Sequence, residues 1–158
     1  MSPRERVNTS ALGVTVAYLV MAFVLLLVSA TVSPRLGLPI VETLPLLFLG
    51  LALVAIGFAF RYLGLEPLLA ANRSIQWAHV PGTLVEDGVF RYSRNPAYLG
   101  VLLMFLGALL VAVNLPMLIV LAVMFALLNR QASREEGVLT GRFGEPYLAY
   151  KKRTRRWL

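Results

Sequence analysis

The sequence has no cysteine, a single histidine and few charged residues. The absence of cysteine excludes a disulfide scaffold, a cysteine-based metal site and a cysteine nucleophile. His79 alone cannot build a zinc site, which needs three or four ligands, so we expect no metal. Charged residues make up 15% of the chain, hydrophobic residues 58%, and the mean hydropathy is +0.74. Soluble domains hold about 45–50% apolar and about 25% charged residues, so this composition indicates a membrane protein.

Long uncharged stretches set the predicted architecture. We predict an all-α integral membrane protein in which residues 1–158 form a single domain. A helix needs about 20 apolar residues to cross a bilayer, and four stretches supply such helices. The predicted transmembrane helices cover about 10–32, 43–61, 96–113 and 116–131.

The last two helices are predicted to form a hairpin. The uncharged run from Asn95 to Asn129 is too long for one span and contains Asn114 and Pro116, which favour a turn. Pro116 suits the first turn of a helix, where its missing N–H costs little. We expect the fourth helix to continue as an amphipathic helix to Leu139.

Basic residues indicate the orientation in the membrane. Of the 15 Lys and Arg residues, all except Arg35 fall in the N-terminal segment, the second loop or the C-terminal tail. The positive-inside rule therefore predicts that both termini, the polar face and an amphipathic C-terminal tail are cytoplasmic. The net charge of +7 is interpreted as topology and binding of anionic lipid rather than of nucleic acid. As an alternative, Val28-Ser29-Ala30 resembles a signal-peptide cleavage site, although the apolar run exceeds the usual 7–15 residues.

The first of three polar clusters leads into the third helix. Asp87-Gly88 is a turn signal, and Asn95 and Pro96 suit the N-cap and the first helical position. Free N–H groups at that helix start suit a carboxylate ligand. Gly100 permits close approach of a ligand or of a neighbouring helix. The alternative is an ordinary helix start in which Tyr98 lies in the aromatic belt.

The second cluster is the acidic pair Glu135-Glu136, which follows the fourth span. Paired acids near a membrane are often functional, and they could bind a sulfonium, an amine or a ribose diol. The alternative is a solvated charge pair satisfied by Arg130 and Arg134.

The third cluster occupies residues 141–158. Tyr147 and Tyr150 are three residues apart and share a face of a predicted short helix. The basic run that follows, with Trp157, suits an interfacial helix on anionic lipid, and simple anchoring is the alternative to a catalytic role. His79 is interpreted as structural or interfacial rather than catalytic. Gly50 and Gly57 could pack a neighbouring helix within or between chains, and the oligomeric state is left open.

Together these clusters resemble the isoprenylcysteine carboxyl methyltransferase family, which groups with phospholipid methyltransferases and related small bacterial membrane methyltransferases. The resemblance covers about residues 80–158. The matching residues before the hairpin are Gly88, Phe90, Arg91, Tyr92, Arg94, Asn95, Pro96, Tyr98 and Gly100. The matching residues after it are Glu135, Glu136, Phe143, Gly144, Tyr147, Tyr150, Lys151, Arg156 and Trp157.

The resemblance implies methyl transfer from S-adenosylmethionine, with S-adenosylhomocysteine as product, to a lipophilic or prenylated acceptor. By the resemblance, the cofactor-binding residues are Arg94, Asn95, Pro96, Tyr98, Leu99, Gly100, Glu135, Glu136 and Tyr147. The expected catalytic residues are Glu135, Arg130 and Arg134, the two arginines orienting an anionic acceptor. This chain has Asn95 where the carboxyl methyltransferases of eukaryotes have histidine, and Tyr98-Leu99-Gly100 where phospholipid methyltransferases have Gly-x-Gly.

Two other classes of function stay open at this point. One is a non-catalytic membrane protein that binds lipid or assists assembly, and the other is a sterol-reductase-like enzyme that uses a nicotinamide cofactor. The acceptor is equally open between prenylcysteine, a lipid amine, a thiol and a phenol. The methyltransferase hypothesis requires the start of the third helix to meet the acidic pair in space.

Overall fold

The computed structural model describes residues 3–72 and 83–158, with side chains over 11–68 and 83–158. Trp77 and His79 lie outside these ranges, so their interpretation stays a prediction. The described residues are mostly helical and contain no strand, as the composition predicts. In chain order the elements are α1 (Pro3–Arg35), α2 (Leu44–Asn72), the 3-10 helix η1 (Gly88–Arg91), α3 (Pro96–Val111), α4 (Leu115–Phe143) and α5 (Glu145–Arg153).

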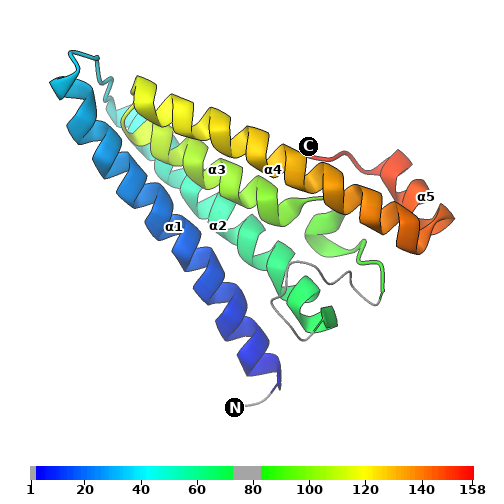
Figure 1. Cartoon of the computed structure of the whole chain (residues 1–158). Helices are drawn as coiled ribbons and strands as arrows, with labels where there is room; N and C mark the ends of the chain where they lie inside the picture. Colours follow the sequence, from blue (N-terminus) through cyan, green and yellow to red (C-terminus); the bar gives the residue numbers. More distant parts are fainter. Residues whose placement is uncertain (1–2, 73–82) are drawn as a thin grey trace.

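The four long helices run alternately up and down in a bundle (Figure 1). The α1–α2 connection and the α3–α4 turn lie at the same end, where Val41 and Val113 exchange two backbone hydrogen bonds of 2.9 and 3.0 Å. The segment before α3 and the short helix α5 lie toward the other end. The α1–α2 and α3–α4 connections therefore lie at the opposite end of the bundle from the polar segments.

The α3–α4 hairpin is confirmed. Asn114 caps α4, because its Oδ1 accepts a 2.8 Å hydrogen bond from the backbone N–H of Met117. Pro116 lies in the first turn, as expected. Helix α4 then continues without a break to Phe143, four residues beyond the predicted extension to Leu139.

Three helices are long and apolar enough to cross a membrane: Ala11–Arg35, Leu44–Leu68 and Leu115–Phe143. Helix α3 has 16 residues and is shorter, so the structure supports three candidate spans rather than the predicted four. Helix α2 continues past the predicted span end at 61, because Arg61 is buried among other helices and does not terminate it.

Apolar side chains cover much of the outer surface of the bundle. Large exposed hydrophobic residues project from α1, α2 and α4; examples are Val20, Phe23, Leu27, Leu44, Phe48, Leu51, Leu118, Ile119 and Val123. Helix α3 contributes the centre of the core, with Val101, Met104 and Phe105 at 0% exposure. Such an apolar exterior is the surface of a membrane protein.

Helices α2 and α3 touch backbone to backbone along facing glycines. A Cβ atom on Gly57 would lie 2.6 Å from the carbonyl oxygen of Gly100, and one on Gly107 would lie 2.5 Å from that of Gly50. Small residues permit this close packing in membranes. The prediction that Gly50 and Gly57 pack a neighbouring helix is therefore confirmed, and the neighbour is α3 of the same chain.

Candidate functional site

The three polar clusters meet at one place, which we call the junction. Its core residues are Arg94 and Tyr98 at the start of α3, Glu135 and Glu136 on α4, and Arg156 after α5. Two direct contacts join α4 to the start of α3, one from each acid. The start of α3 and the acidic pair are therefore in contact, as the methyltransferase hypothesis requires.

Glu136 is the most buried acid of the junction, at 3% exposure. Its Oε1 accepts hydrogen bonds of 2.9 Å from Nη2 of Arg94 and 2.9 Å from Nε of Arg156. Nη2 of Arg156 donates to Oε2 at 3.0 Å, and Nζ of Lys151 lies 3.4 Å from the same oxygen. The hydrogen bonds to Glu136 raise the pKa of Arg156 above its ordinary value. A buried carboxylate needs such compensation, and here protein cations supply it.

Arg94 ties the C-terminal tail to the start of α3. Besides Glu136, its guanidinium donates from Nη1 to the carbonyl oxygens of Thr154 at 2.6 Å and Lys151 at 3.0 Å. Its own backbone N–H donates to the carbonyl oxygen of Arg155 at 2.9 Å. The donors of Arg94 are thus engaged within the protein, and its expected role in cofactor binding stays a prediction.

Glu135 has a different environment from its neighbour. Its Oε1 accepts hydrogen bonds from the hydroxyl of Tyr98 at 2.5 Å and from Nε2 of Gln131 at 2.9 Å. Among the described residues, no donor reaches Oε2. Glu135 therefore keeps one carboxylate oxygen for a further partner.

Arg61 is a buried cation at the residue where the sequence predicts that the second transmembrane helix ends. Its side chain, at 0% exposure, lies over the ring of Tyr18 at 4.6 Å and donates to the carbonyl oxygen of Ala97 at 3.3 Å. It also interacts electrostatically with Tyr98 and Glu135. The sequence does contain a signal that the helix continues past Arg61. Gly64 follows Gly57 by seven residues, which is the spacing of one helix face, and Arg61 lies between them.

An aromatic cluster holds α5 against η1. Tyr147 and Tyr150 share a buried face, as predicted, with ring centroids 6.0 Å apart. The hydroxyl of Tyr150 donates to the carbonyl oxygen of Phe90 at 2.7 Å. Burial raises the pKa of Tyr147 to about 12 and also raises that of Tyr150. Both phenols therefore ionise at a higher pH than an ordinary tyrosine does.

The remaining predicted site residues lie at the start of α3 or on the exposed face of α4. Asn95 holds the N-cap position of α3 and Pro96 follows it, as expected, yet the Asn95 side chain makes no capping bond and its buried Nδ2 has no partner among the described residues. Gly100 faces the backbone of α2, so of its two sequence interpretations the structure supports helix packing. Leu99 is buried at 6% exposure. Arg130 and Arg134 are exposed and satisfy neither acid.

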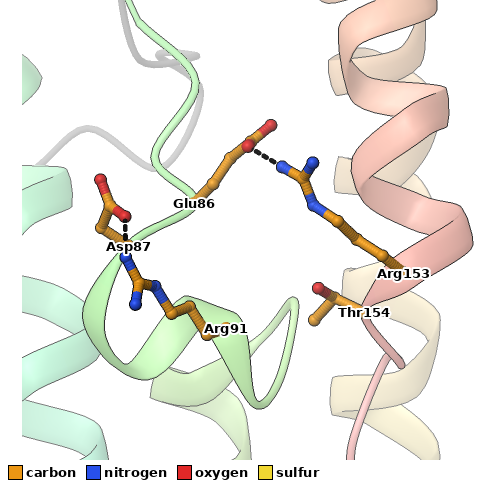
Figure 2. A pocket seen from close by; sticks show the side chains of 5 residues that line it. All are labelled: Glu86, Asp87, Arg91, Arg153 and Thr154. Carbon is orange, nitrogen blue, oxygen red and sulfur yellow. Dashed lines mark hydrogen bonds and ion pairs between the residues drawn. The ribbon is translucent and has the colours of Figure 1, made fainter.

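A surface pocket of about 390 Å³ opens beside the tail, near the junction. It is lined by Glu86, Asp87, Arg91, Arg153 and Thr154. Figure 2 shows Glu86 reaching toward Arg153 across the pocket and Asp87 paired with Arg91. Thr154 links the two sites, since its carbonyl oxygen accepts from Arg94.

Residues 45–146 match the family described as phospholipid methyltransferase, which covers more than half of the 158 residues. The chain belongs to the phospholipid methyltransferase family. Membership confirms the predicted family resemblance and indicates a methyltransferase activity in a membrane protein. No curated protein and no solved structure matched the chain.

The family match does not cover the same residues as the resemblance found in the sequence, which covers about residues 80–158. It begins at residue 45, inside α2, and ends at residue 146, in the first turn of α5. It therefore includes Arg61 and both acids but leaves out Tyr147 and Arg156. The contacts that Arg156 makes with Glu136 therefore lie outside the family match and are known from the structure.

Proposed function

We propose that this member of the phospholipid methyltransferase family transfers a methyl group from S-adenosylmethionine to a lipophilic acceptor at the cytoplasmic face of a membrane. The observation that carries the proposal is the hydrogen bond between Tyr98 and Glu135, which joins the helix start to the acidic pair. The acceptor would reach the site from the bilayer and the cofactor from the cytosol.

The donor set at the junction fits the cofactor, which carries a sulfonium, an ammonium and a carboxylate. Glu135 Oε2 is an anionic acceptor without a described partner and suits one of the cations. The unpartnered Nδ2 of Asn95 suits a polar acceptor atom at the start of α3. Since Glu136 is already compensated by Arg94 and Arg156, we propose Glu135 as the acid that contacts the cofactor.

When bound, S-adenosylmethionine supplies an electrophilic methyl group on its sulfonium. The residues of the chain contribute position and exclusion of water. Tyr98, at 7% exposure, fixes the rotamer of Glu135 through the hydroxyl hydrogen bond. Tyr147 is buried next to the junction and closes it from the side of α5.

For the acceptor, we propose that Arg130 and Arg134 orient an anionic group. They lie one helical turn apart on α4 and are exposed, so both can meet the same phosphate or carboxylate. The family description makes a phospholipid amine the first acceptor to test, followed by prenylcysteine, thiol and phenol. The exposed basic residues of the tail suit anionic lipid.

The test is transfer of labelled methyl from S-adenosylmethionine into a membrane lipid extract by purified protein in nanodiscs. We expect a labelled lipid with wild type, its loss with Glu135→Gln, and its retention with Glu42→Gln, an exposed acid at the other end of the bundle. Binding of a nicotinamide cofactor in place of S-adenosylmethionine would instead support a reductase. Binding of neither would support the non-catalytic alternative.

A further inference from the structure

The two acids of the pair have different partners, although they are adjacent in sequence. Both oxygens of Glu136 are bound by cations from two other segments, Arg94 and Arg156. Glu135 instead meets the neutral donors Tyr98 and Gln131 at one oxygen. This division indicates different functions: Glu135 has capacity for a ligand, and Glu136 joins parts of the chain.

Arg156 is held in place by hydrogen bonds of both its backbone and its side chain. Its carbonyl oxygen accepts from the hydroxyl of Ser93 at 2.9 Å, and its Nη1 donates to Oδ1 of Asn129 at 3.1 Å. The next residue, Trp157, lies against Phe125 with ring centroids 5.9 Å apart. These contacts come from the segment before α3 and from α4, so Arg156 bridges the same two elements that form the junction.

Two cross-links connect the start of α3 to α4. Arg94 contacts Glu136, and Tyr98, one turn later on α3, contacts Glu135. Because the acids are adjacent on α4, a movement of the helix backbone at Glu136 also moves Glu135. The alignment of the Tyr98–Glu135 pair therefore depends on Glu136, and Glu136 depends on Arg156 for its bidentate contact.

We propose that Arg156 is a positioning residue of the methyltransferase site: by binding both oxygens of Glu136, it aligns Glu135 with Tyr98 for the cofactor. This inference rests on the proposed function. Arg156 acts through Glu136 and does not itself touch the cofactor. Arg155 differs from it, since that side chain is exposed, which makes the pair a matched comparison within the tail.

The experiment measures the dissociation constant for S-adenosylhomocysteine by calorimetry in nanodiscs, using the full chain. Arg156→Gln should weaken binding by at least about tenfold, because a misplaced Glu135 loses its charge-assisted hydrogen bond to the ligand. Arg156→Lys, which keeps the charge but loses the bidentate geometry, should bind between wild type and Arg156→Gln. Arg155→Gln removes the same charge from the neighbouring residue and should bind as wild type does.

A second readout separates positioning from general loss of structure. With labelled methyl transfer, Arg156→Gln should raise the KM for S-adenosylmethionine and leave kcat at saturating cofactor near wild type. The double variant Arg156→Gln/Glu136→Gln should be no weaker than Glu136→Gln alone, because both changes break one contact. If Arg156→Gln does not fold, Arg156→Lys decides the question, and an affinity equal to wild type overturns the inference.

The outcomes distinguish this inference from the proposed function. If wild type does not bind S-adenosylhomocysteine, the proposed function fails and the positioning role fails with it. If wild type binds but Arg156→Gln has the same affinity and KM, only the positioning role is overturned.

Discussion

The hydroxyl of Tyr98 lies 2.5 Å from Oε1 of Glu135 and joins the first turn of α3 to α4. A short O–H···O⁻ hydrogen bond of this kind is charge-assisted and stronger than one between neutral groups. Gln131, one turn before Glu135 on α4, donates to the same oxygen. Together the two donors fix one side of the carboxylate and leave its other oxygen for a ligand.

Removing the Tyr98 hydroxyl should weaken cofactor binding while the ring still packs. We expect Tyr98→Phe to reduce affinity for S-adenosylhomocysteine about tenfold or more, because hydrogen bonds to charged groups contribute about 1.5–3 kcal/mol. Equilibrium dialysis with labelled ligand measures this. Tyr92→Phe, at a residue that is 67% exposed, is the control and should bind as wild type does. Equal affinity of Tyr98→Phe and wild type would show that this contact has no part in binding.

The glycine packing predicts a stability difference between two similar substitutions. Gly100→Ala places a Cβ 2.5 Å from the carbonyl oxygen of Gly57, so the helices must separate, at a cost of about 1–3 kcal/mol. Gly13→Ala meets nothing within 4 Å and should be neutral or slightly stabilising. Thermal unfolding in detergent checks both. An unchanged Tm for Gly100→Ala would contradict the close α2–α3 contact.

Alkaline pH should release the aromatic cluster that holds α5. Burial raises the pKa of Tyr147 to about 12, from 10.0, so the folded state holds this proton more tightly than the unfolded state. The corresponding stability is fully present below pH 10 and is lost as pH rises to 12. Absorbance at 295 nm, as the difference between wild type and Tyr147→Phe, should show ionisation near pH 12. A midpoint near pH 10 would mean that Tyr147 is exposed in solution.

The absence of cysteine makes the membrane orientation testable by labelling single cysteines. Glu42 and Ala149 are exposed residues, one in the α1–α2 connection and one in α5. If both termini are cytoplasmic, an impermeant maleimide added to intact cells should label Glu42→Cys and spare Ala149→Cys until the membrane is opened. The reverse pattern would place the junction on the outer face.

Local sequence signals predicted much of the helical fold. Apolar runs and turn residues such as Asn114 and Pro116 act within a few residues of each other, so the hairpin could be predicted. The path of α2 beyond Arg61 could not, because the partners of that cation, Tyr18 and the carbonyl of Ala97, come from other helices. A buried charge is tolerated only through such tertiary contacts.

The sequence predicted which residues form the junction, but it did not predict which of them pair with one another. The resemblance brought Arg94, Tyr98 and both acids into one site, and the structure brings them together. The neighbouring Arg134 was the alternative partner for the acids, but residues two apart on a helix point in different directions. Glu136 instead pairs with Arg156, 20 residues later, a contact that depends on how the tail folds back.

Calorimetric titration of S-adenosylhomocysteine into the protein in nanodiscs tests the central claim most directly. The account predicts saturable binding by wild type and a loss of at least about tenfold in affinity for Glu135→Gln, with Glu42→Gln unchanged. Absence of binding by wild type, or equal affinity for wild type and Glu135→Gln, would contradict the claim that the start of α3 and Glu135 together hold the methyl donor.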